Sequence, residues 1–297
     1  MEASEIVRST HHVPILSVVG LGGMGKTTLA QYVCEEDEVV KNFKVIWVHV
    51  STRFSATSVT SKLLESVTGV KPCADHLETL QQMLKQELRF VKFFLILDDV
   101  WEDKNKKEWE NIFAPLRKAE SGSKILVTTR MQSVADMAAN AMGVEREYLE
   151  LEGLQEDESL KLFNHHVYSG RNPQDFENLK PIGEQLAKQL GGCPLVTKVV
   201  SGYLQCNMDP DSWTDFLQEG LVHFNGSEDD VMETLRLSYY CLPAQVQICF
   251  RYCSIFPQDY EFKKKDLVLM WMGSGLISQH ETNQEGLKIL GIRSWLS

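Results

Sequence analysis

Short apolar runs, rich in β-branched residues, recur through the first half of the chain between longer stretches with helical spacing. Most of these runs are apolar at every position instead of alternating, which is typical of parallel strands covered on both faces. The stretches between the runs have lengths suited to helical crossovers. The runs lie at residues 14–20, 45–50, 93–99, 124–129 and 148–151. They predict an α/β domain with a parallel five-stranded sheet over residues 1–151.

Amphipathic helices replace the strands in the second half. After residue 151 the apolar residues recur at the three- and four-residue spacing of a helix face. A Gly-Gly-Cys-Pro sequence at 191–194 marks a helix boundary, as Gly and Pro commonly do. A polar, glycine-containing break at 224–230 marks a second boundary. We therefore expect a helical domain over residues 152–227 and a third, helix-rich domain over residues 228–297.

Composition and charge narrow the possible function classes. The chain has 297 residues, of which 43% are hydrophobic and 24% charged, as in a folded protein of more than one domain. Its net charge of −11 disfavours a general nucleic-acid binder, which needs a basic face. The seven cysteines form no C-x-x-C pair and are interpreted as reduced core thiols. No signal peptide and no run of about 18 apolar residues is present, so a cytoplasmic setting is expected.

The most specific motif begins at Gly20 and reads GLGGMGKT, which matches G-x-x-x-x-G-K-[ST]. It follows an apolar strand and opens a helix, as a phosphate-binding loop does. Backbone N–H groups of such a loop face phosphate oxygens, and the helix N-terminus adds partial positive charge. Lys26 is expected to reach the β- and γ-phosphates, and Thr27 to ligate Mg²⁺. The residues assigned to phosphate binding are Gly22, Gly23, Met24, Gly25, Lys26, Thr27 and Thr28.

Two further strands end in residues that suit the same site. Asp98 and Asp99 close the run FFLILDD, and we expect Asp98 to hold Mg²⁺ together with Thr27. Asp99 is the candidate catalytic residue, which would orient a water molecule or accept its proton. Arg130 follows KILVTT, at the end of a strand where open α/β sheets place ligands, and its planar fork suits a γ-phosphate. The local sequence alone leaves open that Arg130 is an ordinary surface arginine.

Six motifs, taken in order, resemble the NB-ARC module of plant intracellular immune receptors, the nucleotide-binding leucine-rich-repeat proteins. They read GLGGMGKTT, VIWVHVS, FFLILDDVW, GSKILVTTR, GGCPLV and CFRYCSIFPQDYEF. The motif LDDVW, which ends at Trp101, resembles that of the coiled-coil class of these receptors. The resemblance implies a P-loop NTPase domain, a helical domain and a winged-helix domain. It places the strand of Arg130 between those of the P-loop and Asp98, makes Arg130 the γ-phosphate sensor, and assigns Pro194 to the base and ribose.

The resemblance also implies what the module does. Members act as molecular switches in plant defence: ADP holds a closed resting form, and ATP favours an open form that oligomerises. The implied cofactors are therefore ADP or ATP with Mg²⁺, with at most slow ATP hydrolysis. The implied partners are the coiled-coil and leucine-rich-repeat domains of a receptor and, on activation, further copies or the full-length receptor. Neither nucleic acid nor a membrane span is expected.

The sequence departs from the family pattern in three places. GCPLV stands where the family has GLPLA, no clear Gly-Arg motif precedes the P-loop, and no Met-His-Asp triplet follows in the winged-helix region. The third domain is therefore interpreted as truncated before that triplet, and an inactive or regulatory receptor fragment is the alternative function.

Two rivals from other classes are weaker. A phosphotransferase needs an arginine-bearing lid, whereas residues 104–122 are interpreted as a solvated helix. An ATP-dependent DNA-binding regulator needs a basic winged helix, whereas residues 228–297 carry more acidic than basic residues.

Overall fold

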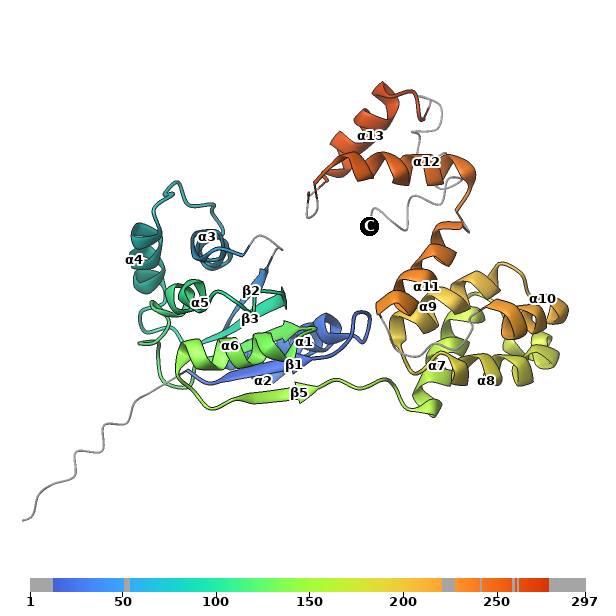
Figure 1. The fold of residues 1–297 in the computed structure, drawn as a ribbon, viewed down its shortest axis with the longest axis horizontal. Helices are drawn as coiled ribbons and strands as arrows, with labels where there is room; N and C mark the ends of the chain where they lie inside the picture. The colour runs from blue at the N-terminus through green and yellow to red at the C-terminus, as the bar shows by residue number, and fades with distance from the viewer. Residues whose placement is uncertain are drawn as a thin grey trace, which may run out of the picture. The chain divides into compact units, whose positions relative to one another are not determined.

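The computed structural model describes residues 13–50, 54–220, 228–240, 242–257, 260 and 262–277 (Figure 1). The chain divides into two compact units, Met1–Glu152 and Gly153–Ser297. The last part of the predicted third domain, residues 278–297, lies outside the described residues. The division into three domains stays a prediction.

The first unit contains a parallel five-stranded sheet in the order β2-β3-β4-β1-β5. The predicted strands are confirmed to within one residue at each end, and the strand that precedes Arg130 lies between the other two strands of the predicted site. The strands are β1 (Ile15–Val19), β2 (Lys44–His49), β3 (Phe93–Val100), β4 (Lys124–Thr129) and β5 (Glu147–Glu150).

Both faces of the sheet are covered by helices, which explains why its central strands are apolar at every position. In β3, Leu95 and Leu97 belong to one buried cluster, whereas Phe94 and Ile96 belong to another on the opposite face. The larger cluster includes side chains of α3 (Ala56–Thr68), α4 (Leu77–Glu87), α5 (Lys106–Phe113) and α6 (Gln132–Met142). The smaller one includes side chains of α1 (Lys26–Glu35) and α2 (Asp37–Asn42).

Helix α5 corrects the expectation that residues 104–122 form a solvated segment. Trp109, Ile112 and Phe113 on this helix are fully buried. The Trp109 ring lies 5.0 Å from the ring of Phe54 and 5.3 Å from that of Phe113, between ring centroids. The charged residues occupy the other face. The apolar positions have the spacing of an amphipathic helix, so this segment has one buried face and only its charged face is solvated.

The second unit is helical. Phe163 and Trp213 are fully buried and make an edge-to-face ring contact at 6.0 Å beside Gly183 of α8, whereas Trp271 of α13 belongs to a separate buried cluster. Its helices are α7 (Glu156–Val167), α8 (Lys180–Gln189), α9 (Pro194–Gln205), α10 (Pro210–Asp215), α11 (Glu228–Tyr240), α12 (Ala244–Tyr252) and α13 (Lys264–Gly273), with short helical turns η1 (Pro173–Leu179), η2 (Phe216–Gly220) and η3 (Cys253–Ile255).

The cysteines bear out their predicted state only in part. Those that the structure describes are free thiols, and Cys193 and Cys249 are buried. Cys73 and Cys206 are exposed, so the expectation of core thiols is wrong for these two. Cys241 lies outside the described residues.

Candidate functional site

The loop between β1 and α1 has the backbone of a phosphate cradle. Gly23 and Gly25 have φ values of 79° and 92°, in the left-handed region that glycine adopts without steric cost. Gly25 is the N-cap of α1, whose first helical residue is Lys26. Because glycine has no side chain to cap the helix, its first N–H groups stay available to an anion at this end. Thr27 and Thr28 lie in the same first turn.

Lys26 folds back over this loop. Its Nζ donates hydrogen bonds to the carbonyl oxygens of Gly20, at 2.7 Å, and Leu21, at 2.8 Å. The residue is only 7% exposed. The loop therefore holds a buried positive charge close to its own backbone, which is the arrangement that attracts phosphate oxygens.

Asp98 and Thr27, predicted as metal ligands from positions 71 residues apart, meet in the structure. The Thr27 hydroxyl donates to Asp98 Oδ1 at 2.9 Å, and the carboxylate is almost completely buried. A hydroxyl and a carboxylate are hard oxygen donors of the kind that Mg²⁺ prefers. The two residues therefore fit a Mg²⁺ ion that also binds the phosphates of a nucleotide.

A β-bulge shapes the end of β3 beside Asp98. Leu97 pairs with Val127 of β4 and Val100 pairs with Thr129, so Asp98 and Asp99 together face the single residue Thr128. Asp99 has a φ of 56°, which is uncommon for a residue other than glycine. Bulges of this kind re-aim side chains next to active sites. The bulge therefore breaks the regular alternation of faces that adjacent residues of a strand have.

Thr128 contacts both acids through one hydroxyl group. Its Oγ1 donates to Asp98 Oδ1 at 2.6 Å and accepts the backbone N–H of Asp99 at 2.9 Å. Thr128 is fully buried. The sequence analysis did not assign this residue, although its place two positions before Arg130 is visible in the motif GSKILVTTR.

Arg130 lies against the phosphate loop. A Cβ atom placed on Gly22 would come within 2.9 Å of Arg130 Nη1, so the guanidinium packs directly on the glycine backbone. Trp101 also contacts the guanidinium: its ring centroid lies 4.5 Å from Arg130 Cζ, a cation–π contact. The structure thus brings Arg130 to the same loop as Lys26 and Thr27, while its role as a sensor stays a prediction.

His49 is a further neighbour that the sequence analysis missed. It is the last residue of β2 and pairs in register with Asp98 of β3. Its Nδ1 lies 3.5 Å from Asp98 Oδ2, and its side chain is half exposed. The motif VIWVHVS includes this residue, but only the strand order shows that it adjoins the acidic pair.

Pro194, the predicted base contact, belongs to the second unit. It is the first residue of α9 and directly follows the buried N-cap residue Cys193. Proline is well suited to the first turn of a helix, where no N–H partner is required. Its contact with a base and ribose stays a prediction of the resemblance.

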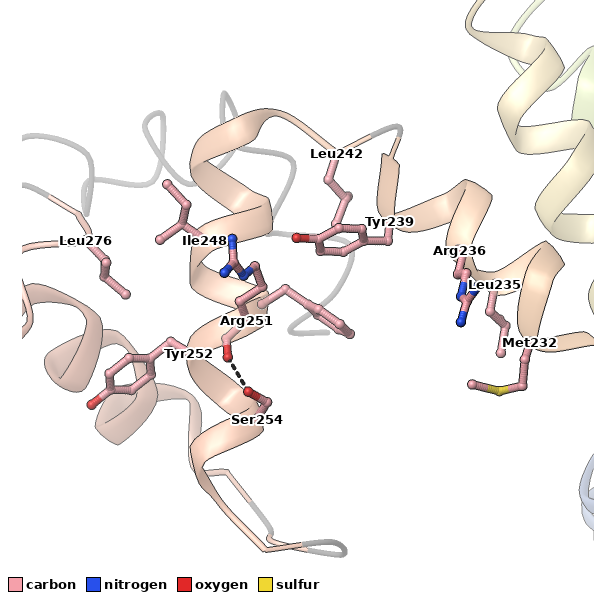
Figure 2. Close-up of a pocket in the computed structure, with 11 residues that line it drawn as sticks. Met232, Leu235, Arg236, Tyr239, Leu242, Ile248, Arg251, Tyr252, Ser254 and Leu276 are labelled. Atoms are coloured by element: carbon pink, nitrogen blue, oxygen red, sulfur yellow. Dashed lines mark hydrogen bonds between the residues drawn. The ribbon is translucent and has the colours of Figure 1, made fainter. Parts of the chain in front are cut away.

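The second unit also contains a hollow of about 860 Å³ between α11 and α12, which contains none of the predicted site residues (Figure 2). Its lining is largely apolar and aromatic, and includes Tyr239 of α11 and Ile248 of α12. Two arginines also line it, Arg236 from α11 and Arg251 from α12. The lining residues that the structure describes include no carboxylate of the kind that would hold Mg²⁺.

Two family models match the chain. The NB-ARC domain matches residues 3–172. The winged-helix domain of disease resistance proteins matches residues 255–292, of which 278–292 lie outside the described residues. None of the helices in the described parts is long and apolar enough to cross a membrane.

Similar proteins come from plants. The chain is 32% identical over 274 residues to the disease resistance protein RGA2 of Solanum bulbocastanum, covering 91% of this chain and 27% of that protein. It is 34% identical over 276 residues to the putative disease resistance RPP13-like protein 1 of Arabidopsis thaliana, covering 92% and 26%. The chain thus spans about a quarter of each relative's length.

Among solved structures, Cdc6p from Pyrobaculum aerophilum matches with a TM-score of 0.50 at 15% identity. The match covers 82% of this chain and 65% of that one. At this identity the likeness concerns the fold alone.

Proposed function

The chain belongs to the NB-ARC family, as a nucleotide-binding module of plant disease resistance proteins followed by their winged-helix region, and from this premise we propose that it is an ADP/ATP switch. In this proposal ADP occupies the P-loop in the resting state and ATP in the active state. The observation that carries it is the convergence of Lys26, the Thr27–Asp98 pair and Arg130 on a single glycine-rich loop.

The side chains divide the work according to their chemistry. Lys26 and the N–H groups that begin α1 bind the phosphates that both nucleotides share. Thr27 and Asp98 hold Mg²⁺, which when bound would offset the negative charge of the phosphates. The planar guanidinium of Arg130 lies at the loop and distinguishes ATP from ADP by binding the additional γ-phosphate of ATP. A site with these parts holds both nucleotides and responds to the difference between them.

Asp99 is assigned to the slow hydrolysis that returns the switch to ADP. It adjoins the metal-binding carboxylate, and its left-handed backbone gives its side chain a direction different from that of a regular strand residue. We propose that it orients the attacking water or accepts its proton. A fast steady-state ATPase would contradict the switch and favour an ordinary enzyme.

The purified chain is expected to carry ADP, or to bind ADP more tightly than ATP. The reason is that ADP occupies the proposed resting state, in which the contacts of Lys26 and the start of α1 with the diphosphate retain it without any need for a γ-phosphate. Heat denaturation releases a bound nucleotide, which ion-exchange chromatography then identifies. Protein free of nucleotide that also binds no added ADP in calorimetry would refute the proposed function.

Arg130→Ala is expected to weaken ATP binding about tenfold and to leave ADP affinity within about a factor of two. A charge-assisted hydrogen bond contributes about 1.5–3 kcal/mol, and the lower end applies because Arg130 is only half-buried. Arg130→Lys is the matched variant, because it keeps the charge but loses the planar fork, and an intermediate loss is expected. Calorimetry with ADP and with a non-hydrolysable ATP analogue measures the difference. Equal losses for both nucleotides would show that Arg130 is no γ-phosphate sensor.

A further inference from the structure

We infer that Thr128 is the positioning residue of the acidic pair, and that its single hydroxyl fixes Asp98 as the metal ligand and Asp99 in its strained backbone conformation together. The inference rests on the proposed function, because it assigns a role within the same nucleotide site. It adds a residue that acts through the two acids instead of touching the nucleotide.

The bulge changes the backbone hydrogen bonds at the end of β3. Two residues of β3 face one residue of β4, so the regular ladder of backbone hydrogen bonds cannot continue past Leu97. The N–H of Asp99 is satisfied instead by the side chain of Thr128, at 2.9 Å. Without this acceptor the N–H of Asp99 would lose its hydrogen bond, so the hydroxyl helps to hold Asp99 at its φ of 56°.

Thr128 also holds the Asp98 carboxylate in one direction. Its Oδ1 accepts hydrogen bonds from Thr128 at 2.6 Å and from Thr27 at 2.9 Å. The Thr128 bond comes from a fully buried residue of the neighbouring strand, and a hydrogen bond to a carboxylate is stronger than one between neutral groups. Thr128 therefore restrains the rotamer of Asp98 even if the Thr27 hydroxyl turns to a metal ion.

The hydroxyl of Thr128 makes both hydrogen bonds, to the Asp98 carboxylate and to the Asp99 N–H. A hydroxyl has one proton to donate and lone pairs to accept, so Thr128 can serve the carboxylate and the N–H at once. With the proton given to Asp98, the lone pairs face Asp99. The hydroxyl of Thr128 therefore couples the orientations of the two acids. Neither valine nor alanine could replace it, because both lack a hydroxyl group.

The test replaces the hydroxyl without changing the shape. Thr128→Val keeps the β-branched volume, and Thr128→Ser keeps the hydroxyl. Outer-shell partners of metal ligands typically contribute roughly 10- to 100-fold to metal affinity. We therefore expect Thr128→Val to weaken Mg²⁺ binding to the ADP-saturated chain at least about tenfold, with Thr128→Ser close to the unmodified chain. Nucleotide affinity in EDTA should change little in either variant.

Thr129→Val is the matched control. Thr129 is the next residue of β4, equally buried and β-branched, and its hydroxyl donates to the carbonyl oxygen of Val100 at 2.7 Å without contacting an acid. The same hydroxyl accepts the backbone N–H of Met131 at 3.1 Å, so its replacement removes two hydrogen bonds from the same strand end. It should therefore alter thermal stability without altering the Mg²⁺ dependence of nucleotide binding.

The outcomes separate the inference from the proposed function. If the unmodified chain binds no ADP in EDTA or in Mg²⁺, the proposed function fails and the inference fails with it. If the unmodified chain binds ADP and Mg²⁺ strengthens that binding, the proposed site stands. An unchanged Mg²⁺ affinity in Thr128→Val, a loss equal to that of Thr129→Val, or no rescue by Thr128→Ser would then each overturn the inference alone.

Discussion

Replacing Lys26 with arginine is expected to lower the affinity for both ADP and ATP by about 100-fold or more. The Lys26 ammonium lies within 2.8 Å of two carbonyl oxygens of the P-loop in a site that is only 7% exposed. A guanidinium is wider, planar and longer, so it cannot occupy this position and still reach the phosphates. A lost charge-assisted contact of about 3 kcal/mol corresponds to about 100-fold in affinity.

Calorimetric titration with ADP and with a non-hydrolysable ATP analogue measures this effect. Lys41→Arg is a suitable control, because Lys41 is an exposed residue of α2 that forms an i,i+4 ion pair with Asp37. Exposed pairs of this kind contribute little, so the control should bind as the unmodified chain does. Binding of wild-type strength in Lys26→Arg would mean that the glycine-rich loop is not a phosphate cradle.

The sheet was predictable because both of its faces are buried. A strand covered on one side alternates apolar and polar residues, whereas Phe94 to Leu97 are apolar without interruption and divide between two clusters. That signal is strong and local. Residues 104–122 were predicted as a solvated helix, and α5 is a helix, but Trp109, Ile112 and Phe113 are buried. The many charged residues of this segment favour a solvated helix, whereas the helical spacing of its apolar residues indicates a buried face.

The residues of the site could be predicted from the sequence, but the contacts between them could not. Lys26 and Thr27 were assigned from the P-loop motif, and Asp98 and Arg130 from their places at the ends of apolar strands, where open α/β sheets bind ligands. The resemblance then gave Arg130 its role as a sensor. Nothing in the spacing indicates that Thr128 faces two residues at once. That contact depends on the register of two strands and on a bulge, which only the paired structure reveals.

The contact between Trp101 and Arg130 likewise could not be predicted from the sequence. Each residue closes a motif at the end of its own strand, and the sequence leaves 28 residues between them. The strand order places their strands side by side, and Arg130 Cζ lies 4.5 Å from the centroid of the Trp101 ring. A local reading allows an ordinary surface arginine at position 130, and it is this non-local packing, with Gly22 alongside, that gives the guanidinium a defined place.

Gly192→Ala is expected to destabilise the second unit by about 3 kcal/mol. Gly192 has a φ of 69°, and a left-handed conformation costs a residue with a side chain about 1–2 kcal/mol. A Cβ at this position would lie 2.4 Å from the carbonyl oxygen of Leu154. The backbone must therefore shift, which weakens the hydrogen bond from Leu154 N to Gly192 O, now 2.8 Å long, at a cost of about 1 kcal/mol.

Gly202→Ala provides the matched control. Gly202 lies inside α9, and a Cβ placed there meets no atom within 4 Å. Alanine in a helix is about 0.5–1 kcal/mol more favourable than glycine, so this variant should be as stable as the unmodified chain or more so.

Thermal unfolding followed by circular dichroism distinguishes the two variants. A loss of about 3 kcal/mol lowers the midpoint of a unit of this size by roughly 6–12 °C, whereas Gly202→Ala should not lower it at all. Equal midpoints for the two variants would show that the Gly-Gly-Cys-Pro turn tolerates a side chain. A selective loss would instead show that glycine at position 192 is required by the close backbone approach of Leu154, a constraint that the motif alone does not reveal.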